Sequence, residues 1–170
     1  MGLGSTASTV GFGAFGLIFG GLVGGVLQHF LNPCNVRNFP DFAGAISEAD
    51  CVSWLSAEGD LGANFIAFVT VTIRIEASLL LALAIGAFYQ LTLPYAERKG
   101  AAFIYGIVSI LACLVDLDHA GILTYGSNQL MTPMMSAASV PLIGLWTFLG
   151  SCFWLSWLLT GSEDAKQKAN

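Results

Sequence analysis

The stretch from Val10 to Leu31 reads VGFGAFGLIFGGLVGGVLQHFL and carries no formal charge. A membrane-spanning helix needs about 20 mostly apolar residues to cross about 30 Å of hydrocarbon. This stretch is long enough, and similar apolar stretches follow at about residues 64–91, 101–119 and 137–160. The sequence therefore predicts an all-α fold, a four-transmembrane-helix bundle that forms one membrane domain over residues 1–170.

The composition agrees with a membrane location. Of the 170 residues, 55% are hydrophobic and only 10% are charged, and the mean hydropathy is +0.74. Soluble globular proteins carry about 25% charged residues. Six Lys and Arg stand against eleven Asp and Glu, so the net charge is -5 and no basic patch is available for nucleic acid. These figures exclude an ordinary cytosolic enzyme, a disordered tail and a nucleic-acid-binding protein.

The basic residues predict the orientation of the chain in the membrane. Arg98 and Lys99 lie between the second and third stretches, Lys166 and Lys168 follow the fourth, and Arg37 alone lies on the other side. Loops rich in Lys and Arg stay in the cytoplasm. We therefore expect both termini and the 92–100 loop in the cytoplasm, and an acidic outer loop at about residues 32–61. A plasma or vesicle membrane is favoured, with an organelle membrane as the alternative.

Two of the four cysteines belong to that outer loop. Cys34 and Cys51 lie in it, whereas Cys113 and Cys152 lie inside spans. A disulfide between the first two would close a loop of about 18 residues and stabilise the fold by about 3 kcal/mol. We expect this disulfide-bearing outer loop, with two unpaired thiols as the alternative. No Cys-x-x-Cys or nearby histidine pair suggests zinc.

Glycines recur along the first span. Residues four apart share one helix face, and small residues there let a second helix approach closely. We expect these glycines to pack against another span of the same chain, with a second protein as the alternative. The candidate packing residues are Gly16, Gly20 and Gly24, with Gly21 and Gly25 as a second series.

Polar and ionisable residues lie at a similar depth in three of the spans. At 1.5 Å per residue, their positions are about 22–28 Å from the inner boundary, which predicts one polar layer in the outer part of the bundle. We expect Arg74 to pair with Asp116 or Asp118, because an unpaired charge at that depth is costly. The layer comprises Gln28, His29, Arg74, Glu76, Asp116, Asp118 and His119.

Three interpretations of this layer compete. A structural ion pair that fixes helix register is favoured, a transport or ion-binding site is second, and a metal or pigment site is third. Asp116 and His119 share a face, and Glu76 and His29 could join them as ligands, but the paired Glu-x-x-His repeats of di-iron bundles are missing. We therefore expect no metal and no cofactor.

No catalytic set is evident. The sequence lacks Gly-x-Ser-x-Gly, His-Glu-x-x-His, a phosphate-binding loop and a dinucleotide fingerprint. Only two histidines are present, which leaves little for acid–base chemistry. We expect a protein that is not an enzyme.

The overall plan resembles that of tetraspan membrane proteins. FGGLV at 19–23, NFIAFV at 64–69 and LWTFL at 145–149 resemble stretches of MARVEL-domain proteins. The claudins share the plan, but their Gly-Leu-Trp followed by two close cysteines is absent, because here Trp54 follows Cys51. The resemblance implies a role in membrane apposition, vesicle traffic or lateral organisation, without catalysis.

These observations lead to one functional hypothesis and two alternatives. The hypothesis is a protein that organises membranes or junctions through lateral helix packing and its acidic outer loop, with the lipid bilayer and other membrane proteins, or further copies of itself, as partners. The alternatives are a small accessory subunit of a large photosynthetic, respiratory or channel complex, and a small oligomeric channel or transporter.

Overall fold

The structure, a computed structural model, describes residues 2–31, 60–123 and 133–169. Side chains are described in these ranges except at 22–31, 60–70, 73, 76, 77, 133–138 and 162–169. Throughout the described residues the chain is helical and contains no strand, so the all-α prediction is confirmed. The elements are α1 (Leu3–Leu31), α3 (Asp60–Thr92), the short 3-10 helix η3 (Tyr95–Arg98), α4 (Lys99–His119) and α5 (Pro133–Ala169).

Within the described ranges, three helical segments are long and apolar enough to cross a membrane. They are Leu3–Gly21, Tyr95–His119 and Ser139–Gly161, and Ser78–Thr92 is a shorter apolar segment within α3. The described helices therefore have the length and apolar character of a membrane protein. Side chains up to residue 70, in the second of the four predicted spans, lie outside the description, and so do residues 32–59 of the predicted outer loop.

The helices extend beyond the apolar stretches that the sequence delimits. Helix α1 begins seven residues before Val10, because Ala7 and Ser8 are buried and continue its packed face. Helix α5 begins at Pro133, so Pro141 lies inside the helix and not in its first turn. Proline removes one helical hydrogen bond, and transmembrane helices tolerate this where neighbouring groups compensate.

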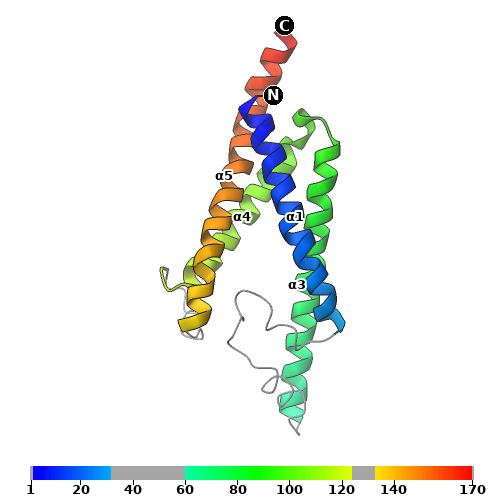
Figure 1. Ribbon diagram of the computed structural model, residues 1–170, viewed down its shortest axis with the longest axis vertical. Helices are drawn as coiled ribbons and strands as arrows, with labels where there is room; N and C mark the ends of the chain where they lie inside the picture. Colours follow the sequence, from blue (N-terminus) through cyan, green and yellow to red (C-terminus); the bar gives the residue numbers. More distant parts are fainter. Residues whose placement is uncertain (1, 32–59, 124–132, 170) are drawn as a thin grey trace.

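Helix α1 is the central element of the arrangement. It packs against α3 and α5, while α4 packs against α5. Figure 1 shows that the beginning of α1, η3 and the end of α5 lie at one end of the molecule, and that α3 and the α4–α5 pair spread apart toward the other end. We call these the α3 arm and the α4–α5 arm. Among the described helices, the two arms therefore lie together at one end of the molecule and apart at the other.

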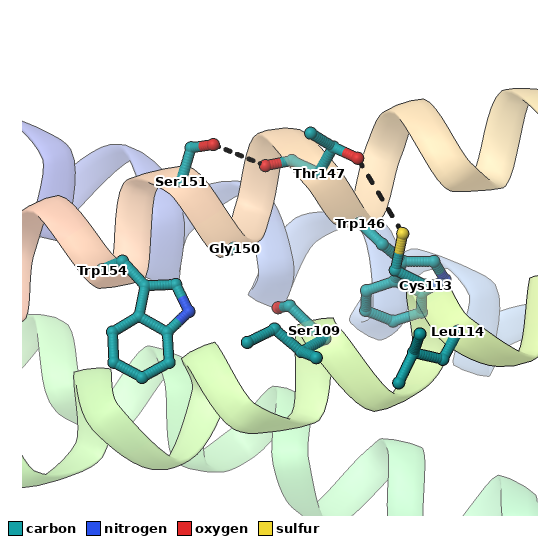
Figure 2. A pocket seen from close by; sticks show the side chains of 9 residues that line it. Ser109, Cys113, Leu114, Trp146, Thr147, Gly150, Ser151 and Trp154 are labelled. Carbon is teal, nitrogen blue, oxygen red and sulfur yellow. Dashed lines mark hydrogen bonds between the residues drawn. The ribbon is translucent and has the colours of Figure 1, made fainter. Parts of the chain in front are cut away.

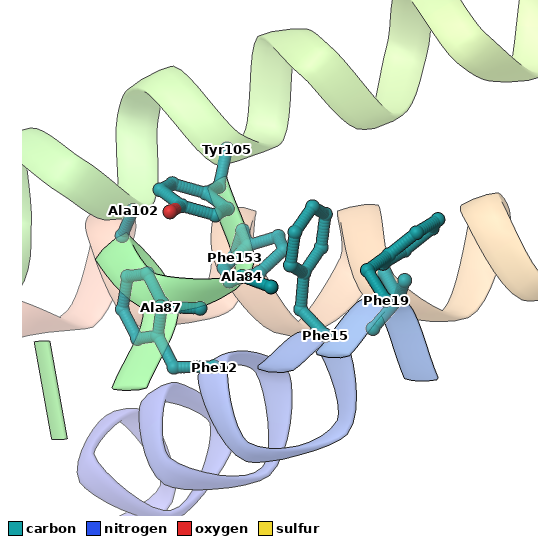
Figure 3. Packing of buried hydrophobic residues seen from close by; sticks show 9 residues of the cluster. Phe12, Phe15, Phe19, Ala84, Ala87, Ala102, Tyr105 and Phe153 are labelled. Carbon is teal, nitrogen blue, oxygen red and sulfur yellow. The ribbon is translucent and has the colours of Figure 1, made fainter. Parts of the chain in front are cut away.

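An aromatic cluster joins the two arms near the end where they meet (Figure 3). Phe12, Phe15 and Phe19 are spaced by three and four residues, so their rings lie on one face of α1 and are buried. The Tyr105 ring of α4 lies 5.2 Å from Phe12 and 5.0 Å from Phe15, and Phe153 of α5 lies 5.0 Å from Phe12. Edge-to-face ring contacts at these separations are favourable.

A hydrogen bond ties α4 directly to α3. The Tyr105 hydroxyl donates to the Leu83 carbonyl of α3 over 2.6 Å. Gly86 leaves room for this hydroxyl, since a Cβ at that position would lie 2.8 Å from it. The buried Ala84 and Ala87 complete the α3 side of the aromatic cluster. Small residues on α3 thus let the large rings of α1 and α4 fill the junction.

Candidate functional site

Two glycines of α1, Gly16 and Gly20, lie on its contact with α3. A Cβ at Gly16 would lie 2.9 Å from the Phe88 ring, and a Cβ at Gly20 would lie 3.4 Å from it. Nothing lies within 4 Å of a Cβ at Gly21, and the surroundings of Gly24 and Gly25 are outside the description. The Gly16 and Gly20 positions therefore serve a contact within the chain, through the close approach of the Phe88 ring.

The described members of the predicted polar layer differ in exposure. Arg74 is exposed on α3, whereas Asp116 and Asp118 are buried near the end of α4. Figure 1 shows α3 and α4 in different arms. The pairing of Arg74 with Asp116 or Asp118 stays a prediction.

The remaining predicted residues are only partly described. His119 is half-buried at the end of α4, and the side chains of Gln28, His29 and Glu76 lie outside the description. Among the described residues, no three His, Cys, Asp or Glu side chains are grouped so that they could hold a metal ion. Cys34 and Cys51 also lie outside the described residues.

A groove runs along the outer side of the α4–α5 contact (Figure 2). Its volume is about 370 Å³. Glycines keep the two helices close along it: a Cβ at Gly106 would lie 3.0 Å from the Trp154 ring, and a Cβ at Gly150 would lie 3.4 Å from Ser109 Cβ. The groove is lined by Ser109, Ile110, Cys113, Leu114, Trp146, Thr147, Gly150, Ser151 and Trp154.

The hydroxyl groups of the groove donate to their own helices. Ser109 donates to the Tyr105 carbonyl over 2.9 Å, and Ser151 donates to the Thr147 carbonyl over 2.8 Å. Such bonds to the carbonyl four residues earlier satisfy a hydroxyl donor within a helix. The Trp154 indole N–H makes no hydrogen bond with another described residue, and Figure 2 shows its nitrogen on the ring edge toward the groove. The groove is thus apolar, with one available donor.

An aromatic ladder continues from the groove to the end of the α4–α5 arm that adjoins η3. Phe103, Trp154 and Trp157 form it, with ring centroids 5.7 Å apart for Phe103–Trp154, 5.5 Å for Phe103–Trp157 and 5.6 Å for Trp154–Trp157. The Lys99 ammonium lies 5.9 Å from the centroid of the Trp157 ring. A cation over a tryptophan face is attracted by the ring quadrupole. The ladder therefore ends in a positive charge.

Arg98 joins η3 to its neighbours. Its guanidinium donates to the Leu93 carbonyl over 2.9 Å, to the Leu91 carbonyl over 3.2 Å and to the Thr9 hydroxyl over 3.4 Å. Arg98 and Lys99 are adjacent in sequence, yet the first holds the loop together and the second is exposed. The positive charges of the loop therefore have different roles.

The α3 arm presents a second surface. Helix α3 packs mainly on α1, and its large side chains Val71, Ile75 and Leu79 are between half and three-fifths exposed. They line a shallow pocket of about 350 Å³ together with Arg74 and Ser78. Positions 71, 75 and 79 are four residues apart, so they form one stripe on the helix. We call this stripe the α3 face.

Sequence reasoning missed both the groove and the ladder. The available signals were the i, i+4 spacing of Ser109 with Cys113 and of Thr147 with Ser151, beside glycines. These patterns do not reveal which helix faces which, so they become informative only once α4 and α5 are known to pack together.

The chain has no match in the comparisons with known proteins. No family model, curated protein or solved structure matches this sequence.

Proposed function

We propose that the chain is a four-span membrane protein without enzymatic activity that organises its membrane through lateral contacts with other membrane proteins. The observation that carries this proposal is the α3 face. Because α3 packs mainly on α1, the apolar α3 face lies on the outside of the bundle. Lipid tails are as apolar as leucine, so close packing and polar contacts must drive helix association in a membrane. The pocket along the α3 face supplies a surface for close packing, and Arg74 and Ser78 add polar groups to it.

The proposed topology has four spans, with both termini and η3 in the cytoplasm. Its support is geometric and electrostatic. The beginning of α1, η3 and the end of α5 lie at one end of the molecule (Figure 1), and four of the six basic residues belong to the segments at that end. Helix α3 has 33 residues, which at 1.5 Å per residue gives about 50 Å, more than the bilayer hydrocarbon requires.

A crosslinking experiment tests the lateral contact. A photoreactive residue in place of Leu79 samples the α3 face, and the same residue in place of Leu158 samples an exposed position on α5. The proposal expects protein adducts from position 79 in native membranes and only lipid adducts from position 158. If position 79 also gives only lipid adducts, the α3 face is not a protein contact.

The identity of the adducts separates the main alternative from the proposal. Adducts to further copies of the chain, or to several membrane proteins, fit an organiser. Adducts to one large subunit of a complex with fixed composition fit an accessory subunit, for which the same α3 face would be the docking surface. A channel or transporter is the remaining alternative, and adducts from position 79 to further copies of the chain alone would fit its oligomer.

The proposal includes a disulfide between Cys34 and Cys51 in the acidic outer loop, and a plasma or vesicle membrane. The intramembrane Cys113 and Cys152 are free thiols. Denatured protein should therefore take up thiol reagent at these two cysteines before reduction, and at all four after it. Four reactive thiols before reduction would remove the disulfide from the proposal.

A further inference from the structure

The groove and the aromatic ladder form one continuous strip on the α4–α5 arm. Helices α4 and α5 run antiparallel, since Lys99 lies near Gly161, Gly106 near Trp154, and Cys113 Sγ lies 3.9 Å from the Thr147 hydroxyl. Along α4, positions 99, 103, 106, 110 and 113 follow at intervals of three and four residues, which places them on one helix face. The strip therefore leads from an exposed cation at the loop end into an apolar groove.

The depth of the strip matches one leaflet of a bilayer. At 1.5 Å per residue, the Gly106–Trp154 level lies about 10 Å below Lys99, and the Cys113–Thr147 level about 21 Å below it. The interfacial layer on each side of a bilayer is about 5–7 Å thick, and half of the hydrocarbon is about 15 Å. With Lys99 among the headgroups, the groove spans the hydrocarbon of a single leaflet, where lipid acyl chains lie.

The chemistry of the strip also changes with depth. Lys99 is exposed, and among the described residues its only recorded interaction is with the Trp157 ring, so its ammonium donors are available to an anion. Below it the Trp154 indole N–H offers one donor toward the groove. Deeper still, Ile110, Leu114 and Trp146 provide apolar walls. The three levels match the three parts of a phospholipid. The cation is complementary to a phosphate, the neutral donor to an ester carbonyl, and the apolar groove to an acyl chain.

We propose that the α4–α5 groove binds one phospholipid, with its phosphate at Lys99, an ester carbonyl oxygen accepting from the Trp154 indole N–H, and one acyl chain along the groove. This inference rests on the proposed membrane location. It concerns the α4–α5 arm, whereas the proposed protein contact concerns the α3 face, so one can fail while the other holds.

Native mass spectrometry of the full chain in detergent provides the test, with dioleoyl phosphatidylglycerol as the titrated probe. The wild type should bind one such lipid in preference to further lipids. Lys99→Gln should weaken this binding about fivefold, the effect of one cation near a membrane surface, and Lys99→Arg should restore it. Ser151→Phe, which fills the groove, should abolish the preferred site.

Matched control variants show whether a loss of lipid binding comes from the groove and Lys99 or from any added ring or lost charge. Gly144→Phe adds the same ring to α5 at a position with nothing within 4 Å of its Cβ, and it should leave binding unchanged. Lys168→Gln removes the same charge from the terminal segment and should also have no effect. Near-ultraviolet circular dichroism of each variant reports whether the tryptophans keep their packing. If Ser151→Phe does not fold, a phosphatidylglycerol with a photoreactive mid-chain group locates the lipid, and it should label α4 and α5 peptides.

Three results would overturn the inference. The first is that the Lys99→Gln and Ser151→Phe variants bind the lipid as tightly as the wild type does. The second is dioleoylglycerol, which lacks the phosphate, binding as tightly as dioleoyl phosphatidylglycerol. The third is photolabel spread evenly over all helices, which would indicate unselective solvation by lipid. Tighter binding of phosphatidylglycerol than of phosphatidylcholine would support it, because the choline cation opposes Lys99.

Discussion

Replacing Phe15 with alanine should destabilise the fold by about 2–4 kcal/mol. The Phe15 side chain is fully buried, and the rings of Phe19 and Tyr105 lie 4.5 and 5.0 Å away, with Phe153 and Trp146 at 6.2 and 6.4 Å. In soluble proteins a buried Phe→Ala change costs about 3–5 kcal/mol. In a membrane the unfolded helix keeps its ring in lipid, so the transfer contribution is largely lost. The cavity and the ring contacts remain, at about 0.5–1.5 kcal/mol for each ring pair.

Reversible unfolding by sodium dodecyl sulfate in mixed micelles, followed by near-ultraviolet circular dichroism, measures this difference. Phe148→Ala is the matched control, because Phe148 is half exposed on α5, and its loss should change the free energy of unfolding by less than about 0.5 kcal/mol. Equal effects of the two substitutions would show that the aromatic cluster does not hold the arms together.

The hydrogen bond of Tyr105, the close contact at Gly16 and the proposed topology can each be tested separately. Tyr105→Phe removes the hydrogen bond to the Leu83 carbonyl and should cost about 0.6–1.7 kcal/mol in the same unfolding assay; no change would mean that the bond contributes nothing to joining α4 and α3. Gly16→Leu should destabilise by about 1–3 kcal/mol through overpacking, whereas Gly13→Leu, with nothing within 4 Å of its Cβ, should not; equal effects would contradict the close α1–α3 contact. Reporter cysteines at both termini and in η3 should react with an impermeant maleimide only from the cytoplasmic face, and labelling of any of them from the outside would contradict the proposed topology.

Much of the fold is predictable from the sequence because helix formation in a membrane is a local matter. An uncharged apolar stretch must satisfy its backbone hydrogen bonds internally, so the stretch from Val10 gives α1 without reference to any partner. The helix ends are less predictable. Ser8 carries a polar side chain, yet it is helical and buried. The composition of the first turns does not show that they pack against other helices, so the sequence does not reveal where α1 begins.

The lateral arrangement could not be predicted in the same way. Depth along a helix follows from counting residues, and this is the basis of the prediction that Arg74, Asp116 and Asp118 share one layer. Whether two helices touch depends on which faces pack, and here Phe12, Phe15 and Tyr105 join the α3 arm to the α4–α5 arm. The groove was missed for the same reason, since Trp154 and Gly106 become neighbours only through the α4–α5 packing.

The size and composition of the native particle test the central claim, lateral association in a membrane, most directly. The protein would be extracted gently into native nanodiscs, and the mass of the particle and everything in it would be measured. We expect further copies of the chain or other membrane proteins in the particle, with the α3 face at the contact. A particle that holds a single chain and lipid alone, at native expression levels, would contradict the claim.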